Sequence, residues 1–135
     1  MRPWGCLAVL GVLLGTTQGC GVSDGSVGPG AQTTAQRFTH AVSSGNHAQA
    51  CSLLAPQTKA QLEQAAGKPC AVALAEENLP AADAFEDSAT FGTMAQVRFA
   101  GDTVFLAKFA QGWKVFAAGC SPAPGQPYDC RVQGG

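Results

Sequence analysis

The sequence predicts an α+β domain in which three N-terminal helices pack on a curved antiparallel sheet of about four strands. Apolar residues recur with helical spacing from residue 34 onward. After residue 80 the pattern changes to the alternation of apolar and polar residues that is typical of strands. A chain of 135 residues is long enough for one such domain with a single core and too short for two.

The N-terminal residues have the pattern of an export signal. An uncharged run rich in Leu, Val, Ala and Gly extends from Cys6 to Gly15, after the positively charged Arg2. This run has the length of a signal-peptide core, because about ten residues are too few for a membrane-spanning helix, which needs ~20. We therefore expect residues 1–19 to be a signal peptide that is removed.

Cys20 would then begin the mature chain. The Gly19-Cys20 pair resembles the lipobox of bacterial lipoproteins, in which the cysteine receives diacylglycerol, with acyl chains such as palmitate, on its sulfur. Thr17 and Gln18 differ from the most common lipobox residues, so cleavage by an ordinary signal peptidase is the alternative. The resemblance implies a lipid anchor at the outer face of the cell membrane, and the alternative implies secretion.

Residues 20–33 are predicted to be a flexible tether. The segment is rich in Gly and Ser, and it has no periodic apolar face. A Gly/Ser-rich coil of about fourteen residues would hold the following domain on the order of 20 Å from the membrane surface.

The domain itself is expected at residues 34–120, with its helices first. Phe38 marks the buried face of the first helix, Thr33 or Thr34 can cap its start, and Gly45 ends it. The expected helices run from Thr34 to Gly45, from Asn46 or His47 to Ala55, and from Gln57 to Ala66, with one or two further turns between Cys70 and Glu77.

Four strands are predicted after Pro80. The tight turns at Gly101-Asp102 and Gln111-Gly112 separate the last three of them. Apolar residues on both faces of the later strands imply that helices cover one side of the sheet. The expected strands are Asp83 to Phe91, Met94 to Ala100, Thr103 to Ala110 and Trp113 to Ala118.

The four cysteines after Cys20 form two local pairs. Three connectivities are open to four cysteines, and the local spacing favours Cys51–Cys70 and Cys120–Cys130. Export supports disulfides, and the absence of CxxC spacing and of nearby His argues against zinc. Residues 121–135 contain several Pro and Gly, so we expect an irregular tail that the second disulfide holds.

The charge of the chain is nearly balanced, with eight Lys and Arg against nine Asp and Glu. This balance indicates neither nucleic acid nor anionic lipid as an electrostatic partner. No phosphate-binding Gly loop, metal-ligand cluster or Ser-His-Asp order is present, so we expect no metal and no cofactor.

The order of helices followed by a meander ending in Gly112-Trp113-Lys114-Val115 resembles the cone-shaped, cystatin-like α+β fold named for nuclear transport factor 2. The resemblance covers Thr34 to Cys120, and it implies a pocket between the helices and the sheet without implying an activity. Several segments also resemble small exported lipoproteins of actinobacteria: Phe38, Ala41-Val42, Gly45-Asn46, Ala50-Cys51, Leu53-Leu54, Ala95 to Phe99, Trp113 and Ala117-Ala118-Gly119-Cys120.

Six residues are candidates for lining such a pocket. Arg98 and Lys108 would bind an anionic ligand if both pointed into the concave face, although the strand alternation favours outward-facing side chains. Aromatic strand residues more often form core than pocket walls. The candidates are Phe38, Arg98, Phe105, Lys108, Phe109 and Trp113.

Enzymes with this cone-shaped fold use an Asp or His as a base, and the candidates here are few. His40 is predicted to point away from the Phe38 face into solvent, and His47 to lie at a helix start. Asp83 and Asp87 flank Phe85 and Glu86 in the weakest strand, where paired carboxylates usually serve solubility. Asp102 is placed in a turn, and Asp129 lies beside the single tyrosine, Tyr128.

The leading hypothesis from the sequence is a non-catalytic, lipid-anchored extracytoplasmic domain that binds a small apolar ligand or an envelope protein. The alternatives are an isomerase or dehydratase with an Asp or His in the cone, and a structural or regulatory interaction module without a pocket.

Overall fold

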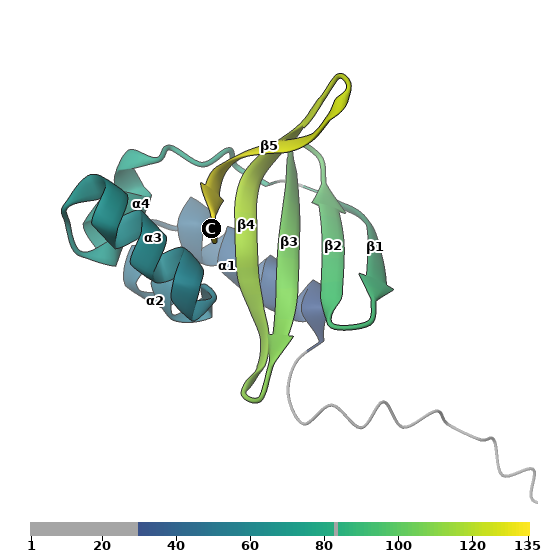
Figure 1. Cartoon of the computed structure of the whole chain (residues 1–135), viewed down its shortest axis with the longest axis horizontal. Helices are drawn as coiled ribbons and strands as arrows, with labels where there is room; N and C mark the ends of the chain where they lie inside the picture. Colours follow the sequence, from purple (N-terminus) through teal and green to yellow (C-terminus); the bar gives the residue numbers. More distant parts are fainter. Residues whose placement is uncertain (1–29, 83) are drawn as a thin grey trace, which may run out of the picture.

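A computed structural model describes residues 30–82 and 84–135 and has an α+β fold, as predicted (Figure 1). Four helices precede five strands that form one antiparallel sheet in the order β1-β2-β3-β4-β5. The helices are α1 (Ala31–Ser43), α2 (His47–Leu53), α3 (Pro56–Ala66) and α4 (Cys70–Glu76). The strands are β1 (Phe85–Phe91), β2 (Met94–Phe99), β3 (Asp102–Phe109), β4 (Gly112–Ala123) and β5 (Gln126–Gln133).

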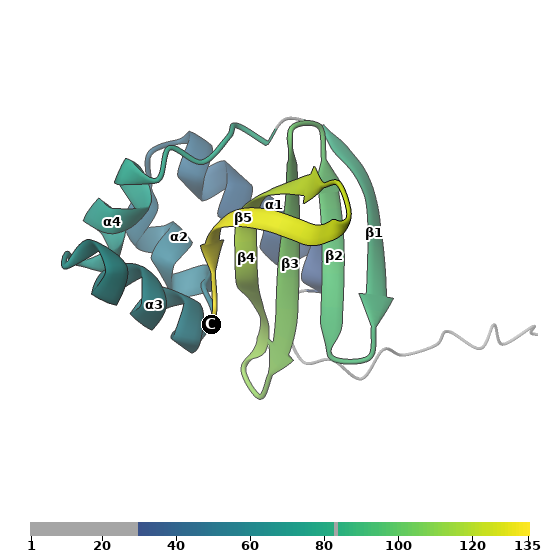
Figure 2. The same cartoon turned by 45° about the horizontal axis from the view of Figure 1, so that its top comes forward.

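The helices occupy one face and one side of the sheet. Helix α1 crosses one face behind β2, β3 and β4, whereas α2, α3 and α4 gather beside β4 and β5 (Figures 1 and 2). We call the face that α1 covers the inner face and the opposite one the outer face. The far end of the β4–β5 hairpin bends across the outer face, so neither face of the sheet is bare throughout (Figure 2).

Helix α1 starts earlier than predicted. It begins at Ala31 rather than Thr34, with Gly30 at the N-cap and no side-chain cap, so Thr33 and Thr34 do not serve as caps. Burial explains the difference, because Ala31 and Thr34 continue the helical stripe of Phe38 against the sheet. The expected tether therefore loses residues 31–33, and its residues 20–29 lie outside the described residues.

The other helices are short and depend on tertiary contacts. Asn46 caps α2 by accepting the N–H of Gln49 at 3.2 Å, and Gly67 ends α3 in the left-handed conformation. The turn between α2 and α3 is fixed to β4, because the N–H of Ala55 donates to the carbonyl of Val115 at 2.8 Å. Residues 70–76 form a fourth helix of about two turns, where the sequence predicts one or two further turns.

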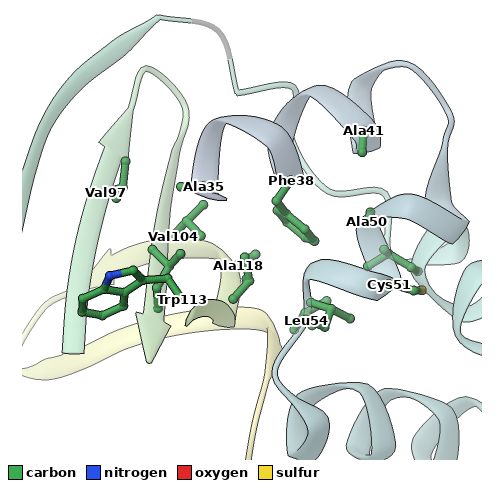
Figure 3. Packing of buried hydrophobic residues seen from close by; sticks show 14 of the residues in the cluster. Ala35, Phe38, Ala41, Ala50, Cys51, Leu54, Val97, Val104, Trp113 and Ala118 are labelled. Atoms are coloured by element: carbon green, nitrogen blue, oxygen red, sulfur yellow. The ribbon is translucent and has the colours of Figure 1, made fainter. Parts of the chain in front are cut away.

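The core lies between α1 and the inner face. Phe38 lies among Ala118 of β4, Leu54 and Ala50, and small residues such as Ala35 let the helix approach the strands closely (Figure 3). The sheet contributes mainly β-branched and leucine side chains. These fully buried residues are Val97, Val104, Leu106 and Val115.

Both disulfides join the cysteines that the spacing predicts. Cys51–Cys70 connects α2 to the start of α4, and Cys120–Cys130 connects residues that lie directly opposite each other on β4 and β5.

The expected irregular tail at residues 121–135 was wrong. Strand β4 continues to Ala123, and β5 returns from Gln126 to Gln133, which gives five strands instead of four. Of the Pro and Gly residues that suggested a tail, Pro124 and Gly125 lie in the turn, and Pro122 lies where the pairing of β4 with β5 is irregular. Pro127 is tolerated on β5 because an edge strand leaves some N–H groups unpaired.

Of the helices in the described part of the chain, none has the length and apolarity required to cross a membrane.

Removing either disulfide is expected to lower the free energy of unfolding by about 3 kcal/mol, because the unfolded chain regains the entropy of an open loop. The loops close over 19 and 10 residues. We therefore expect Cys51→Ala with Cys70→Ala to cost slightly more than Cys120→Ala with Cys130→Ala. Urea unfolding followed by Trp113 fluorescence measures both, and a loss below about 1 kcal/mol for either pair would contradict this expectation.

Candidate functional site

The end of the β4–β5 hairpin, Ser121 to Asp129, is called the arm here. It starts beyond the Cys120–Cys130 disulfide and folds over the outer face of the sheet (Figure 2). Tyr128 holds it there in two ways. Its ring packs edge-on against Phe105 of β3 with centroids 5.0 Å apart, and its hydroxyl accepts a hydrogen bond from Nε2 of Gln96 of β2 at 3.2 Å.

A groove of about 270 Å³ lies between the arm and the outer face. Its walls are almost wholly apolar, no charged side chain lines it, and Gln133 supplies its one side-chain amide. An apolar concavity with few polar groups is typical of sites for small molecules. The lining residues are Met94, Phe105, Phe116, Ala117, Pro127, Tyr128, Cys130 and Gln133.

Two irregularities in the pairing of β3 with β4 shape the groove. Phe105 pairs with Ala117 while Leu106 pairs with Val115, so Phe116 is an extra residue on β4. Its carbonyl accepts hydrogen bonds from the hydroxyl of buried Thr58 at 2.9 Å and from the N–H of Gly134 at 3.0 Å. This bulge brings Phe116 to the groove beside Ala117.

The second bulge lies between the Phe105–Ala117 and Thr103–Cys120 pairs, and the carboxylate of Asp102 stabilises it. Asp102 is only 6% exposed, and it accepts the N–H of Cys120 at 2.9 Å and the N–H of Gly119 at 3.2 Å. These two N–H groups would otherwise be buried without a partner, which is costly. The bulge increases the local twist of β4 just before the arm begins.

Burial raises the pKa of Asp102 above its ordinary value, and the N–H groups of Cys120, Gly119 and Thr103 and the positive charge of Arg131 oppose this shift. Sequence reasoning had placed Asp102 in an ordinary turn. Because both carboxylate oxygens already accept backbone hydrogen bonds, Asp102 acts as a structural anchor rather than as a free base. Its acceptor role was hard to foresee, because its partners follow 17 and 18 residues later.

Residues next to this second bulge also fix its position in the fold. Gly119 has a φ of +66°, which strains any other residue, and a Cβ atom there would lie 2.7 Å from Cδ2 of Leu79, so the Leu79 side chain would have to move. Nη1 of Arg131 donates to the carbonyls of Asn78 at 2.6 Å and Glu77 at 3.2 Å. The segment between α4 and β1 is thereby attached to β5.

The predicted pocket residues do not come together in one site. Phe38 and Trp113 are buried in the core, whereas Phe105 lines the groove on the outer face. Lys108 is exposed with Nζ 5.8 Å from the ring centre of Trp113.

The remaining two pocket candidates lie elsewhere. Arg98 is exposed and pairs with Asp87 at 2.9 Å and Glu86 at 3.8 Å, and Phe109 is half-buried at the end of β3. Of the six candidates, only Phe105 lines the groove. The other groove residues were missed because the arm had been expected to be an irregular tail.

Apart from Asp102, the candidate bases that the structure describes have no enclosed position. His40 is exposed and lines a shallow pocket with Phe85 and Phe99 between α1 and β1, and His47 is the first residue of α2. Asp129 is exposed on the arm. Asp87 is exposed in its ion pair, and Asp83 lies outside the described residues. Within residues 30–82 and 84–135, no group of three His, Cys, Asp or Glu side chains is placed to hold a metal ion.

Replacing Asp102 by Ala is expected to lower the free energy of unfolding by about 2–4 kcal/mol, because two buried N–H groups lose their acceptor. The pKa of Asp102 is raised in the folded state above 3.8, so the stability that this group contributes is complete below about pH 3.8 and falls as the pH rises through the folded-state pKa. The difference between wild type and Asp102→Ala should therefore shrink as the pH rises above about 3.8.

Urea unfolding at a series of pH values measures this difference, with Asp129→Ala as the matched control because Asp129 is exposed. A difference that grows with pH, or one no larger than that of the control, would contradict the assigned role of Asp102.

Comparisons of the chain with protein families, with curated proteins and with solved structures find no match.

Proposed function

We propose that this chain is a lipid-anchored extracytoplasmic domain that binds a small apolar ligand in the groove between the arm and the outer face. The observation that carries the proposal is the lining of the groove, in which three aromatic rings, Met94 and Pro127 meet without a charged side chain. Water in such a space gains few hydrogen bonds, so an apolar ligand that displaces it is favoured.

The size and the polar groups of the groove indicate the class of ligand. Its volume of about 270 Å³ lies just below the ~300–1,000 Å³ of common ligand pockets, which suits one ring system or a short acyl segment. The hydroxyl of Tyr128 accepts from Gln96 and keeps its own proton free for a polar group of the ligand. The amide of Gln133 offers a second polar contact.

Two further parts of the proposal rest on the sequence. The helices followed by a twisted antiparallel sheet support a relation to the cone-shaped fold named for nuclear transport factor 2, within small exported lipoproteins of actinobacteria. In this chain Phe38, Leu106 and Val115 fill the space between α1 and the sheet, so the ligand would bind on the outer face instead. The two disulfides are compatible with an extracytoplasmic location.

The groove is tested with Nile red, a neutral dye whose fluorescence rises in apolar surroundings. Ala117 is buried in the groove wall, so Ala117→Leu would place three more carbon atoms in the ligand space. We expect saturable binding to the wild-type chain and at least about tenfold weaker binding to Ala117→Leu, because the added side chain excludes the dye.

The matched control is Ala60→Leu, the same change at an exposed position of α3. Equal affinity of Ala117→Leu and Ala60→Leu for the dye, with both variants folded, would rule out the groove as the site. If the chain captures a specific envelope protein and Ala117→Leu does not weaken this capture, the alternative of a protein partner is supported instead.

The anchor is tested by Cys20→Ser in the full chain. We expect the wild-type protein to incorporate labelled palmitate and to stay with membranes through a wash at high salt, because a lipid anchor is not screened by ions. The variant should incorporate no label and be removed by the wash. Retention of processed Cys20→Ser through the same wash would disprove the anchor.

A further inference from the structure

One end of the domain carries exposed apolar and basic side chains at two neighbouring turns. The turn end, as we call it, comprises residues 90–94 between β1 and β2 and residues 107–114 between β3 and β4. Both turns lie at the lower end of the molecule in Figures 1 and 2, and α1 also starts there. The two turns are in contact, because the N–H of Lys108 donates to the carbonyl of Thr93 at 2.8 Å.

The apolar part of the turn end is formed by Phe91 and Met94, which are 68% and 40% exposed. They face each other across the β1–β2 turn, and the row continues through Ala107 to Lys114 on the outer face. An exposed phenylalanine at the tip of a hairpin is costly in water, and it is stabilised in the interfacial region of a bilayer.

The charge of the turn end is positive, although the whole chain is nearly neutral. Lys114 ends this row on the outer face, Lys108 lies next to Ala107 but on the opposite face of β3, and the residues at 90–94 and 107–114 include no Asp or Glu. Neither lysine forms an ion pair within the described residues; Lys108 is exposed, whereas Lys114 is half-buried and its Nζ donates to the carbonyl of Ser52 at 2.9 Å. Glu86 and Asp87 lie toward the opposite end of β1. The nearly neutral net charge of the whole chain therefore does not reveal that this end of the domain is basic.

From these observations we infer that the turn end is a membrane-docking surface, which inserts Phe91 and Met94 between lipids and binds anionic headgroups through Lys108 and Lys114. A lipid surface fits better than a protein, because Phe91 and Met94 are the only large exposed apolar side chains of the turn end, whereas a stable protein interface needs about 800 Å² per partner with complementary shape. A bilayer accepts one or two apolar side chains flanked by cations without shape complementarity.

The position of the chain entry supports the same partner, in a step that rests on the anchor of the proposed function. The described chain enters the domain at Gly30, next to the turn end (Figure 1). About ten residues separate it from Cys20, and a Gly/Ser-rich coil of that length reaches roughly 17 Å. A lipid on Cys20 would thus keep the turn end close to the bilayer and raise its effective concentration there.

The test uses the full processed chain with Cys20→Ser, so that binding does not depend on the anchor. Vesicles of phosphatidylcholine and phosphatidylglycerol in a three-to-one ratio are the probe, and vesicles of phosphatidylcholine alone are the reference. We expect stronger sedimentation with the anionic vesicles and a decline as salt is raised above about 0.1 M, because salt screens exposed charges.

Variants of the turn end locate the surface. We expect Phe91→Ser to weaken partition to the anionic vesicles about tenfold and each of Lys108→Gln and Lys114→Gln about fivefold. The matched controls are Val72→Ser and Lys68→Gln, which change an exposed apolar residue of α4 and an exposed lysine beside it, away from the turn end. The controls should bind like the parent chain.

A second measurement reports insertion directly. Phe91→Trp should be quenched by phosphatidylcholine brominated in its acyl chains when phosphatidylglycerol is present, whereas Val72→Trp should not be quenched beyond the background of Trp113.

Equal partition of Phe91→Ser and Val72→Ser, or no preference for anionic vesicles, would overturn the docking surface. Self-association that Phe91→Ser abolishes, without vesicle binding, would assign the surface to a protein contact and would also overturn it. Met94 also lines the groove, but Phe91, Lys108 and Lys114 do not. Because Cys20 is already replaced and the variants leave the groove unchanged, these results are independent of the tests of the anchor and of the ligand site.

Discussion

The hydrogen bonds from Gly119 and Cys120 to the carboxylate of Asp102 determine the shape of the outer face. An extra residue in a strand leaves backbone N–H groups without partners in the regular ladder. When these groups are buried, the bulge is stable only if another acceptor binds them. With Asp102 in place, β4 twists before residue 121 and the arm crosses the sheet instead of extending into solvent (Figure 2). The groove exists only because of this crossing.

The same region joins parts of the chain that are distant in sequence. Arg131 binds the carbonyls of Glu77 and Asn78, and Leu79 occupies the space that a side chain at position 119 would need. Helices, linker and the last two strands therefore depend on one another, although each helix is short. Their stability comes from burial and from tertiary hydrogen bonds more than from helical propensity.

Local sequence patterns were sufficient where neighbouring residues determine the structure. The spacing of Phe38 and its neighbours predicted a helix, the alternation of Ala95, Val97 and Phe99 predicted the inward face of a strand, and the cysteine spacing predicted both disulfides. Prediction failed where distant residues decide. Nothing near Asp102 identifies its acceptor role, and nothing near Pro127 reveals that Tyr128 would contact Phe105 and complete the groove.

The Cys120–Cys130 disulfide has a further consequence for a protein outside the cytoplasm. It closes the arm into a covalent ring, so a protease that cuts any one bond between Ser121 and Asp129 leaves the two pieces joined. Strand β5 would stay paired with β4, and Val132 would stay buried in the core. The arm can thus be nicked without release of the C-terminal strand.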